Sequence, residues 1–258
     1  MNLLEGLEKC GRLLFDLCFP RICAVCGRTL LYHEQHFCLE CFADIPFTHF
    51  WNVQDNPAEK VFWGRCRVER VYSLFYYTNN YRGPIHMLKY DGHTPIGKYL
   101  GGMLGEKLLL PDNFIQFDYI VPVPLHWRKL LSRGYNQSEV IAQGIREGLS
   151  GRGNVPKIIP NLLCRKRFAA SQTSKERQQR WDSVKEAYAL NRYCRKTPEK
   201  GAHILLVDDV LTTGATLEAC ASILVEQLEC RVSIATLAYV ETALQIQGTP
   251  EDWKDVIG

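Results

Sequence analysis

The chain has 258 residues, of which 46% are hydrophobic and 23% are charged, and its formal net charge is +3. This composition is typical of a globular protein with one domain and a smaller module. The net charge is too small to indicate a nucleic acid or a membrane as the partner. Because no window of about eighteen apolar residues is free of charge, we expect no transmembrane helix.

An amphipathic helix is predicted at the start of the chain, from Asn2 to Phe19. Its apolar residues fall on one face, charged residues interrupt them, and Pro20 ends the pattern. The charged residues distinguish this segment from a signal peptide, and its mixed polar face favours packing on protein over binding to a membrane surface. Without a signal peptide, we expect reduced cysteines and a cytoplasmic location.

Four of the eleven cysteines have the spacing of metal ligands, as two Cys-x2-Cys pairs with eleven residues between them: Cys23, Cys26, Cys38 and Cys41. Two such pairs can present four thiolates to one ion, and this ligand set selects zinc or iron. Since nothing in the chain indicates redox chemistry, zinc is the expected metal. Two disulfides or unrelated free thiols are the alternatives, and His33 or His36 could substitute as ligands.

Strands and helices alternate along the rest of the chain. Strands are predicted at residues 67–77, 118–123, 157–163, 187–190, 203–207 and 231–240. Helices are predicted at residues 79–89, 96–110, 138–149 and 217–228, and residues 51–63 are predicted to be irregular. This alternation predicts an α/β fold with a doubly wound parallel sheet, whose ligands bind at the carboxyl ends of the strands.

The chain therefore divides into four parts. We expect an N-terminal helix and a four-cysteine zinc finger at residues 1–47 and a hood or connecting region at residues 48–110. The main α/β domain is expected at residues 111–244, followed by a polar tail at residues 245–258.

A basic loop follows the strand predicted at residues 118–123. It contains Arg128, Lys129 and Arg133 and leads through a Gly-Tyr-Asn-Gln run into a helix. Guanidinium groups bind phosphate oxygens in a bidentate fork, and lysine acts as a point charge. A solvated basic turn is the alternative, but the Gly-Tyr-Asn-Gln run favours a phosphate-binding loop.

A second basic loop, Arg165 to Arg180, joins two predicted strands. A loop of this length in a compact domain often covers a site as a lid, and a disordered insertion is the alternative. We favour the lid because both basic loops and the loop that follows the strand predicted at residues 203–207 are expected at one edge of the sheet. Its candidate contact residues are Arg167, Ser171, Gln172, Thr173 and Arg177.

The most informative stretch is the run from Ile204 to Thr216, in which a buried strand leads into two acids, a Thr/Gly loop and a helix. The first N–H groups of a helix lack partners and favour an anion, and glycine lets the backbone approach it. The loop consists of Thr212, Thr213, Gly214, Ala215 and Thr216. A phosphate in this loop, beside hydroxyls bound by Asp208 and Asp209, has the chemistry of a ribose 5-phosphate.

This arrangement resembles the phosphoribosyl-pyrophosphate (PRPP) loop of the type I phosphoribosyltransferases. The alternative is a receiver domain, where paired acids at a strand end hold Mg²⁺, but that pattern does not run into a phosphate loop. The resemblance implies a type I phosphoribosyltransferase-like fold for residues 111–244.

A closer resemblance covers about Pro20 to Tyr239. The segments Pro-Val-Pro-Leu-His and Arg-Gly-Tyr-Asn-Gln, the Ser-Gln-Thr of the second basic loop, and Lys89-Tyr90-Asp91-Gly92 are similar to the ComF (ComFC) family. The two Cys pairs ahead of the α/β domain fit the same family. The chain departs from the pattern at Trp127, where proline is common.

The ComF resemblance implies a bacterial cytoplasmic protein of DNA uptake and natural transformation, which handles single-stranded DNA with a helicase partner. It places the ribose hydroxyls on Asp208 and Asp209, which are also the candidate catalytic residues, and the 5-phosphate on the loop from Thr212 to Thr216. It places the pyrophosphate, with Mg²⁺, against Arg128, Lys129 and Arg133. Asp209 is the better-placed candidate base.

Three functions are consistent with the sequence. The first is a phosphoribosyltransferase with an unknown acceptor. The second is a non-catalytic PRPP-binding or single-stranded-DNA-binding module, whose DNA patch would comprise the zinc knuckle, Arg65, Arg67 and Arg70 with Tyr76, Tyr77 and Tyr81. The third is a housekeeping salvage enzyme, but no base-recognition element follows the PRPP loop.

Overall fold

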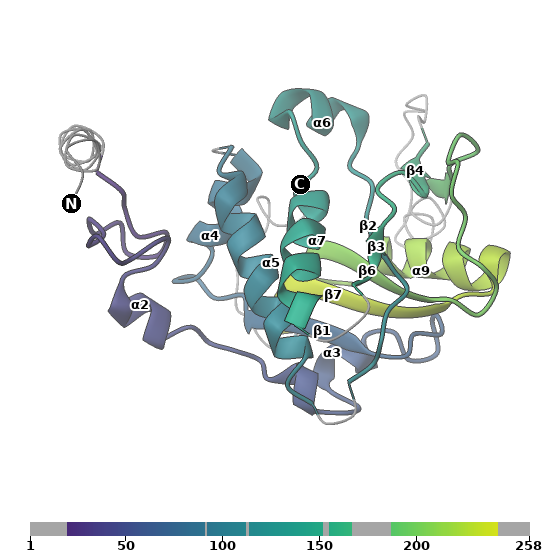
Figure 1. The fold of residues 1–258 in the computed structure, drawn as a ribbon, viewed down its shortest axis with the longest axis horizontal. Helices are drawn as coiled ribbons and strands as arrows, with labels where there is room; N and C mark the ends of the chain where they lie inside the picture. The colour runs from purple at the N-terminus through teal and green to yellow at the C-terminus, as the bar shows by residue number, and fades with distance from the viewer. Residues whose placement is uncertain (1–19, 91, 112–113, 152–154, 167–186, 242–258) are drawn as a thin grey trace, which may run out of the picture.

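The computed structural model describes residues 20–90, 92–111, 114–151, 155–166 and 187–241, and a five-stranded parallel sheet forms its centre (Figure 1). The strand order is β1-β7-β6-β2-β3, with β6 in the middle. The strands are β1 (Val71–Tyr76), β2 (Tyr119–Pro122), β3 (Lys157–Ile158), β6 (His203–Leu211) and β7 (Arg231–Tyr239). The predicted α/β fold with a parallel sheet is confirmed.

Helices cover both faces of the sheet and create two hydrophobic cores. Helices α5 (Thr94–Leu108) and α7 (Gln137–Gly148) pack on one face, and α9 (Ala215–Leu228) packs on the other (Figure 1). Because successive side chains of a strand point to opposite faces, Leu205 belongs to the α5–α7 core and Leu206 to the α9 core. This two-sided burial explains the continuous apolar run that leads into the acidic pair.

Glycines bring α5 and α7 into backbone contact. A Cβ atom on Gly101 would lie 2.4 Å from the carbonyl oxygen of Ile141, and one on Gly144 would lie 2.1 Å from that of Lys98. No side chain can occupy this space, so the two helices pack more closely than ordinary core helices do. Their contact holds the first turn of α7 against the edge of the sheet where the acids lie.

The central strand is longer than predicted. The strand expected at residues 203–207 continues to Leu211, because β6 pairs with β7 as far as Leu211 and Tyr239. Asp208 and Asp209 therefore lie inside β6 and not after it. They do lie beyond the end of β2, whose Pro122 pairs with Val207 of β6, so the space over β2 is open to a ligand.

The prediction of a single strand at residues 157–163 is wrong. Pro160 and Asn161 turn the chain there, so that β3 ends at Ile158 and a new strand, β4 (Leu163–Arg165), begins. Strand β4 pairs with β5 (Tyr188–Leu190) in a separate antiparallel sheet. This small sheet brings Arg165 and Tyr188 beside the main one.

Several short helices were not predicted from the sequence. They are α2 (Leu39–Ala43), α3 (Pro57–Lys60), α6 (Trp127–Arg133) and the 3-10 turns Phe50–Asn52 and Leu149–Gly151. Each is too short to show an apolar period of its own. The helix predicted at residues 79–89 is α4 (Gly83–Tyr90), which begins later because residues 78–82 form a turn.

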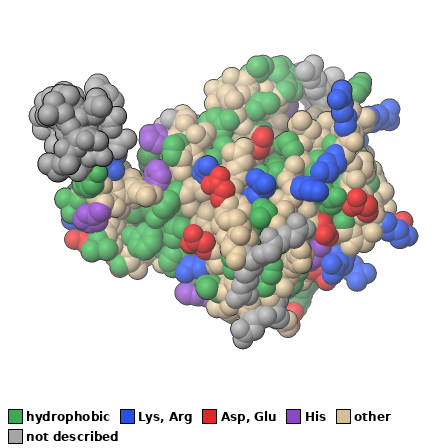
Figure 2. Space-filling model, viewed as in Figure 1, with side chains coloured by type: hydrophobic (Ala, Val, Ile, Leu, Met, Phe, Trp, Pro, Cys, Tyr) green, Lys and Arg blue, Asp and Glu red, His purple; other side chains and the backbone are tan. Residues whose placement is uncertain are grey.

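The four-cysteine module, residues 21–47, packs against the start of α4. The Tyr81 hydroxyl donates a hydrogen bond to the carbonyl oxygen of Cys41 at 2.9 Å, and a Cβ on Gly83 would lie 2.2 Å from the carbonyl oxygen of Ala24. The module's outer surface exposes apolar side chains, including Tyr32 at 74% and Leu39 at 71%. Figure 2 shows hydrophobic side chains on this side of the molecule and lysine and arginine on the opposite side.

Some predictions fall outside the described residues. These are the helix at residues 2–19, Asp91, the tail at residues 245–258, and the lid contacts Arg167, Ser171, Gln172, Thr173 and Arg177. The domain boundaries stay a prediction, although β1 and α5 of the connecting region belong to the central layers. In the described part of the chain, no helix has the length and apolarity needed to cross a membrane.

Candidate functional site

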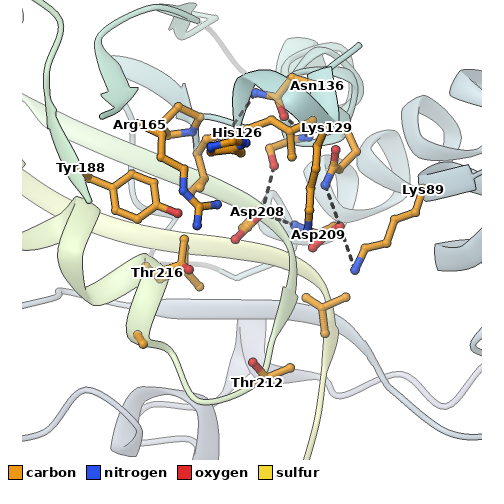
Figure 3. Close-up of a pocket in the computed structure, with 18 of the residues that line it drawn as sticks. Lys89, His126, Lys129, Asn136, Arg165, Tyr188, Asp208, Asp209, Thr212 and Thr216 are labelled. Atoms are coloured by element: carbon orange, nitrogen blue, oxygen red, sulfur yellow. Dashed lines mark hydrogen bonds and ion pairs between the residues drawn. The ribbon is translucent and has the colours of Figure 1, made fainter. Parts of the chain in front are cut away.

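A cavity of about 810 Å³ lies at the carboxyl ends of β2 and β6 (Figure 3). Every described residue predicted to bind PRPP or pyrophosphate lines it: Asp208, Asp209, Thr212, Thr213, Gly214, Ala215, Thr216, Arg128, Lys129 and Arg133. Lys89 and Arg165 also line the cavity, so its walls carry five lysine or arginine side chains against two carboxylates. The fold thus brings together two loops that are far apart in the sequence, and the charge balance favours a polyanionic ligand.

The loop between β6 and α9 has the geometry of an anion cradle. Gly214 has φ of +75° and precedes the first helical residue, and no side chain caps the helix. The N–H groups of the first turn are therefore left to a ligand. A Cβ on Gly214 would lie 2.8 Å from Val61 and 3.2 Å from Phe62, so glycine is required both for the turn and for packing behind it.

Arg65 holds this loop from outside the cavity. Its Nη1 donates to the carbonyl oxygen of Thr213 at 2.9 Å, and its Nε donates to Glu218 Oε2, in the first turn of α9, at 2.9 Å. Glu218 is 3% exposed. One buried ion pair therefore ties the loop to the start of the helix, and Arg65 is a positioning residue for the cradle.

The two acids have different partners. Asp209 is buried, forms an ion pair with Lys89 Nζ at 3.4 Å and accepts a hydrogen bond from Gln137 Nε2 at 3.2 Å. Asp208 accepts from the Ser138 hydroxyl at 3.0 Å and from the backbone N–H of Asp209 at 2.9 Å. In Figure 3 the Lys89 side chain extends toward Asp209, while Asp208 faces the part of the cavity between Arg165 and Thr216.

These surroundings change the protonation of Asp208. Burial, and secondarily the negative charge of Asp209, raise the pKa of Asp208 to about 7. The Ser138 hydrogen bond and the Lys89 charge lower the pKa of Asp208, but their effect is smaller than that of burial and of Asp209. A carboxyl group that titrates near neutral pH can exchange a proton with a ligand.

One buried acceptor in the cavity wall, Gln137 Oε1, has no partner among the described residues. Gln137 is 6% exposed, its amide N–H₂ donates to Asp209, and its Oε1 makes no hydrogen bond within the described part of the protein. A buried oxygen without a donor costs about 1–3 kcal/mol. Because Gln137 lines the cavity, a ligand hydroxyl or amine would supply the missing donor.

The basic wall of the cavity comes from α6 and β4. His126 begins α6 and its Nδ1 accepts from the Arg128 backbone N–H at 3.3 Å, which leaves Nε2 as the protonated nitrogen. Burial and the nearby arginines Arg133 and Arg165, together with Lys89, lower the pKa of Lys129. The cations therefore repel one another in the protein alone, and an anion would relieve this repulsion.

Several cavity residues were not among the predicted ligands, and they include Lys89, Gln137, Ser138 and Tyr188. The Lys-Tyr-Asp-Gly motif could have indicated Lys89 as a site residue, and the polar start of α7 could have indicated Gln137. Ser138 and Tyr188 had none, because a lone serine or tyrosine has no local pattern that indicates a site. The lid residues lie outside the described residues, so their contact with the cavity stays a prediction.

The structure uses the predicted DNA patch for packing. Arg65 pairs with Glu218, and Arg70 Nε lies 2.7 Å from Glu59 Oε1 with its side chain only 12% exposed. Tyr81 is buried and bonded to Cys41. Two of the three arginines are thus neutralised by buried glutamates, and the patch does not form the exposed cationic surface that a nucleic acid needs.

The four predicted cysteines form one cluster. The Sγ atoms of Cys23, Cys26, Cys38 and Cys41 all lie within 4.8 Å of one another. Those of Cys26 and Cys38 are 3.8 Å apart, which equals the edge of about 3.8 Å for a tetrahedron with Zn–S bonds of about 2.3 Å. Neither His33 nor His36 belongs to this four-cysteine cluster. The donor set fits a tetrahedral metal ion, and it contradicts the alternative of unrelated thiols.

The ligand loop of the cluster is preorganised for thiolates. Gly27 has φ of +72°, and the Cys38 backbone N–H donates to the Sγ of Cys23 at 3.4 Å. A backbone hydrogen bond from Cys41, assisted by Arg28, lowers the pKa of Cys38 to about 6. Because thiolates and not thiols bind metal, these contacts favour Cys38 as a ligand at neutral pH.

Comparison with known proteins gives a consistent result. Residues 151–256 match the family "Phosphoribosyl transferase domain". The chain is similar to the DNA utilization protein YhgH of Salmonella typhimurium, with 28% identity over 242 residues, or 91% of this chain and 97% of that protein. It is also similar to Competence protein F of Haemophilus influenzae, with 25% identity over 215 residues, or 80% of this chain and 79% of that protein.

Among solved structures, adenine phosphoribosyltransferase of Saccharomyces cerevisiae is similar over 60% of this chain and 72% of that one, with 15% identity and a TM-score of 0.33. The enzyme of the same name from Leishmania tarentolae is similar over 72% and 89%, with 14% identity and a TM-score of 0.34.

Proposed function

We propose that this chain, which is similar to DNA utilization protein YhgH and Competence protein F and matches a phosphoribosyl transferase domain over residues 151–256, binds PRPP in the cavity between β2 and β6. The observation that carries the proposal is the meeting of an anion cradle, a basic wall and two carboxylates in one cavity of about 810 Å³. PRPP carries a 5-phosphate for the anion cradle, a ribose diol for the two carboxylates and a pyrophosphate for the basic wall.

Each part of PRPP has chemically suitable residues. The 5-phosphate accepts hydrogen bonds from the first N–H groups of α9 and from the threonine hydroxyls of the loop from Thr212 to Thr216. The ribose hydroxyls donate to Asp208 and Asp209, and one of them satisfies the unpartnered Oε1 of Gln137. The pyrophosphate faces Arg128, Lys129 and Arg133, whose mutual repulsion it relieves.

The proposed reaction is transfer of phosphoribose to an acceptor. The bond between C1 and the pyrophosphate oxygen breaks, the electron pair leaves with pyrophosphate, and the acceptor atom bonds to C1 and loses a proton. The basic wall stabilises the leaving group, and the carboxylates stabilise the cationic sugar. Bound Mg²⁺, for which the carboxylate and phosphate oxygens are suitable ligands, would add further neutralisation of the pyrophosphate.

Asp208 is better suited than Asp209 to take the acceptor's proton. The sequence favoured Asp209, but Lys89 and Gln137 occupy that carboxylate. The pKa of Asp208, at about 7, is matched to proton exchange at neutral pH. The predicted lid, whose contact residues lie outside the described residues, is expected to exclude water from the cationic intermediate.

Calorimetry with PRPP and Mg²⁺ tests the binding. Wild-type protein is expected to bind PRPP, and Asp208→Asn with Asp209→Asn is expected to lose it while remaining folded, as its circular dichroism spectrum would show. Arg146→Ala, an exposed cation on α7 away from the cavity, is the matched control for loss of one charge. Equal PRPP affinity in the double variant and the wild type would contradict the site.

Turnover is tested separately. Protein, PRPP and Mg²⁺ are incubated with bases, nucleotides or single-stranded DNA, and released pyrophosphate is measured. Release that requires one acceptor identifies a transferase. PRPP binding without release supports the second candidate, a non-catalytic DNA-handling module, which the names of the relatives favour. A helicase partner stays an expectation from the ComF resemblance.

We also infer that the four-cysteine cluster holds a structural zinc ion. The sulfur-only ligand set and the separation of Cys26 and Cys38 fit tetrahedral Zn²⁺. No open position for substrate remains when four thiolates bind one ion, so the role is structural. Such a site needs reduced thiols, which supports the proposed cytoplasmic location.

A further inference from the structure

The four-cysteine module exposes a group of large apolar side chains, which we call the module patch. They are Ile22 at 52%, Leu31 at 61%, Tyr32 at 74%, Leu39 at 71% and Phe42 at 40%. Figure 2 shows hydrophobic side chains gathered on this side of the molecule. Contiguous apolar surface on a folded protein usually marks a place where another segment or molecule packs.

A buried carboxylate fixes the shape of the module patch. Glu34 is 8% exposed, and its two carboxylate oxygens accept hydrogen bonds from the backbone N–H groups of Leu31 and Leu39, each at 2.7 Å. One side chain therefore holds together two parts of the patch that come from different turns of the module. Phe42 lies three residues beyond Leu39 on α2, and so on the same side of that helix.

The described chain begins at the module patch. The Arg21 guanidinium donates to the carbonyl oxygen of Glu34 at 2.9 Å and to that of Leu31 at 3.3 Å. Ile22, the next residue, belongs to the patch itself. Residues 1–19 lie outside the described residues and are joined to Arg21 by Pro20 alone. Whatever path they take, they are attached at the edge of this apolar surface.

The sequence of residues 2–19 suits an apolar contact. At the spacing of the predicted helix, one face carries Leu3, Leu7, Leu14 and Leu17. A helix of this length spans about 27 Å, which is enough to cross a small module. Its charges are of both signs, three acidic and two basic, so the segment lacks the basic face that binds an anionic membrane.

We propose that residues 2–19 fold back from Pro20 and cover the module patch of the same molecule with their apolar face. Proline ends the predicted helix and allows the chain to change direction there. Because the linker is so short, the effective concentration of the segment at the patch is on the order of millimolar or higher, which favours it over a second copy or a separate protein. This contact is independent of the proposed PRPP binding.

Limited digestion of the full-length protein with trypsin tests the proposal. Trypsin cleaves after Lys9 and Arg12, and mass spectrometry measures the cut chains. Cleavage is expected to be slow in the wild type, because a packed segment must open first. Leu39→Glu places a charge against the apolar face and is expected to speed cleavage at both bonds about ten-fold.

Leu110→Glu is the matched control for this variant. Leu110 is 57% exposed, just after α5 and outside the module. The same substitution there is expected to leave cleavage after Lys9 and Arg12 at the wild-type rate. Equal rates in the wild type and in both variants would overturn the proposal.

A second variant separates loss of the contact from loss of the module's fold. Leu39 follows the cluster residue Cys38, whereas Tyr32 lies in the segment between the two Cys pairs. Tyr32→Glu is expected to speed cleavage as Leu39→Glu does, while its metal content and circular dichroism spectrum stay those of the wild type. Faster cleavage only in variants that lose the module's fold would contradict a contact at the patch.

Two measurements test the other possible occupants. Light scattering is expected to give the same oligomeric state for the wild type and Leu39→Glu. A wild-type dimer that this substitution dissociates would assign the patch to a second copy and overturn the proposal. Anionic vesicles are expected to leave the cleavage rate unchanged. Rapid cleavage in the wild type that vesicles slow would assign the segment to a membrane and also overturn it.

Discussion

The four-cysteine cluster and the β2–β6 cavity differ in how the chain builds them. The cluster takes all its ligands from Cys23 to Cys41, a single short segment with two turns. The cavity takes its walls from Lys89 to Leu217, on strand β6, on helices α4, α6, α7 and α9, and on a separate small sheet. Local spacing was therefore sufficient to predict which four cysteines cluster, whereas the cavity needed the sheet to bring distant loops together.

The two sites also differ in the chemistry of their donors. Four soft sulfur atoms select one ion and leave no room for a substrate. The cavity has hard oxygen acceptors on one side and excess positive charge on the other, which suits a ligand with both a diol and phosphates. They are connected through α4, which begins at the four-cysteine module with Gly83 and ends at the cavity with Lys89.

The largest effect is expected from removing a metal ligand. Cys23→Ser should release zinc and unfold the four-cysteine module, because structural zinc contributes about 10 kcal/mol or more to modules of this kind. Metal analysis and thermal melting measure the loss. Cys164→Ser, on β4 and outside the cluster, is the control that should retain zinc. If purified wild-type protein contains no zinc, the four-cysteine cluster is not a zinc site.

Breaking the buried ion pair should cost less. Lys89→Met leaves Asp209 buried without its cation, in a pair whose side chains are only 6% and 9% exposed. Loss of one partner of a buried pair typically destabilises by about 3–5 kcal/mol. Asp209→Asn in the same chain should restore part of the stability, as a double-mutant cycle in denaturant would measure. Two effects that simply add would show that the residues do not interact.

Gly214→Ala should have a smaller effect on stability but a clear effect on binding. The added Cβ meets Val61 and must adopt φ of +75°, at a cost of about 1–3 kcal/mol. Gly201→Ala, with φ of +80° and no atom within 4 Å, has the same backbone strain without the clash. Only the first variant should lose PRPP in calorimetry, and equal loss in both would contradict the cradle.

Stability should also depend on pH. The folded protein holds a proton on Asp208 up to about pH 7, whereas an unfolded aspartate releases it near pH 4. Stability should therefore fall as pH rises from about 4 to 7 and level off above 7, because the native state binds more protons in that window. Asp208→Asn should flatten this part of the curve. A curve unchanged by the substitution would contradict the assignment.

PRPP affinity should change in the opposite direction. Above about pH 7, Asp208 is ionised and becomes a stronger acceptor for the ribose hydroxyls, so affinity should rise as the pH passes through that value. The same calorimetry on Asp208→Asn measures the part of the rise in affinity that comes from titration of the PRPP phosphates. That part is common to the variant and the wild type. A rise of the same size in the variant would exclude Asp208 as its source.

Features that depend on neighbouring residues could be predicted from the sequence. The Cys-x2-Cys pairs, the alternation of strands and helices, and the acidic pair followed by a Thr/Gly loop each lie within one short segment. They are recognised from turn-forming residues, from the periodicity of apolar residues and from the spacing of metal ligands. None of these requires knowledge of which residues pack against the segment. These features were sufficient for the fold class and for most of the cavity wall.

Which side chains meet was settled by the packing of the folded chain. Strand pairing with β7 extended β6 through the acids, and packing of α4 brought Lys89 to Asp209. The same packing placed Arg65 against the loop between β6 and α9 and left Arg82 beside a cavity. A charge alone does not indicate its partner, because that depends on contacts between residues far apart in the chain.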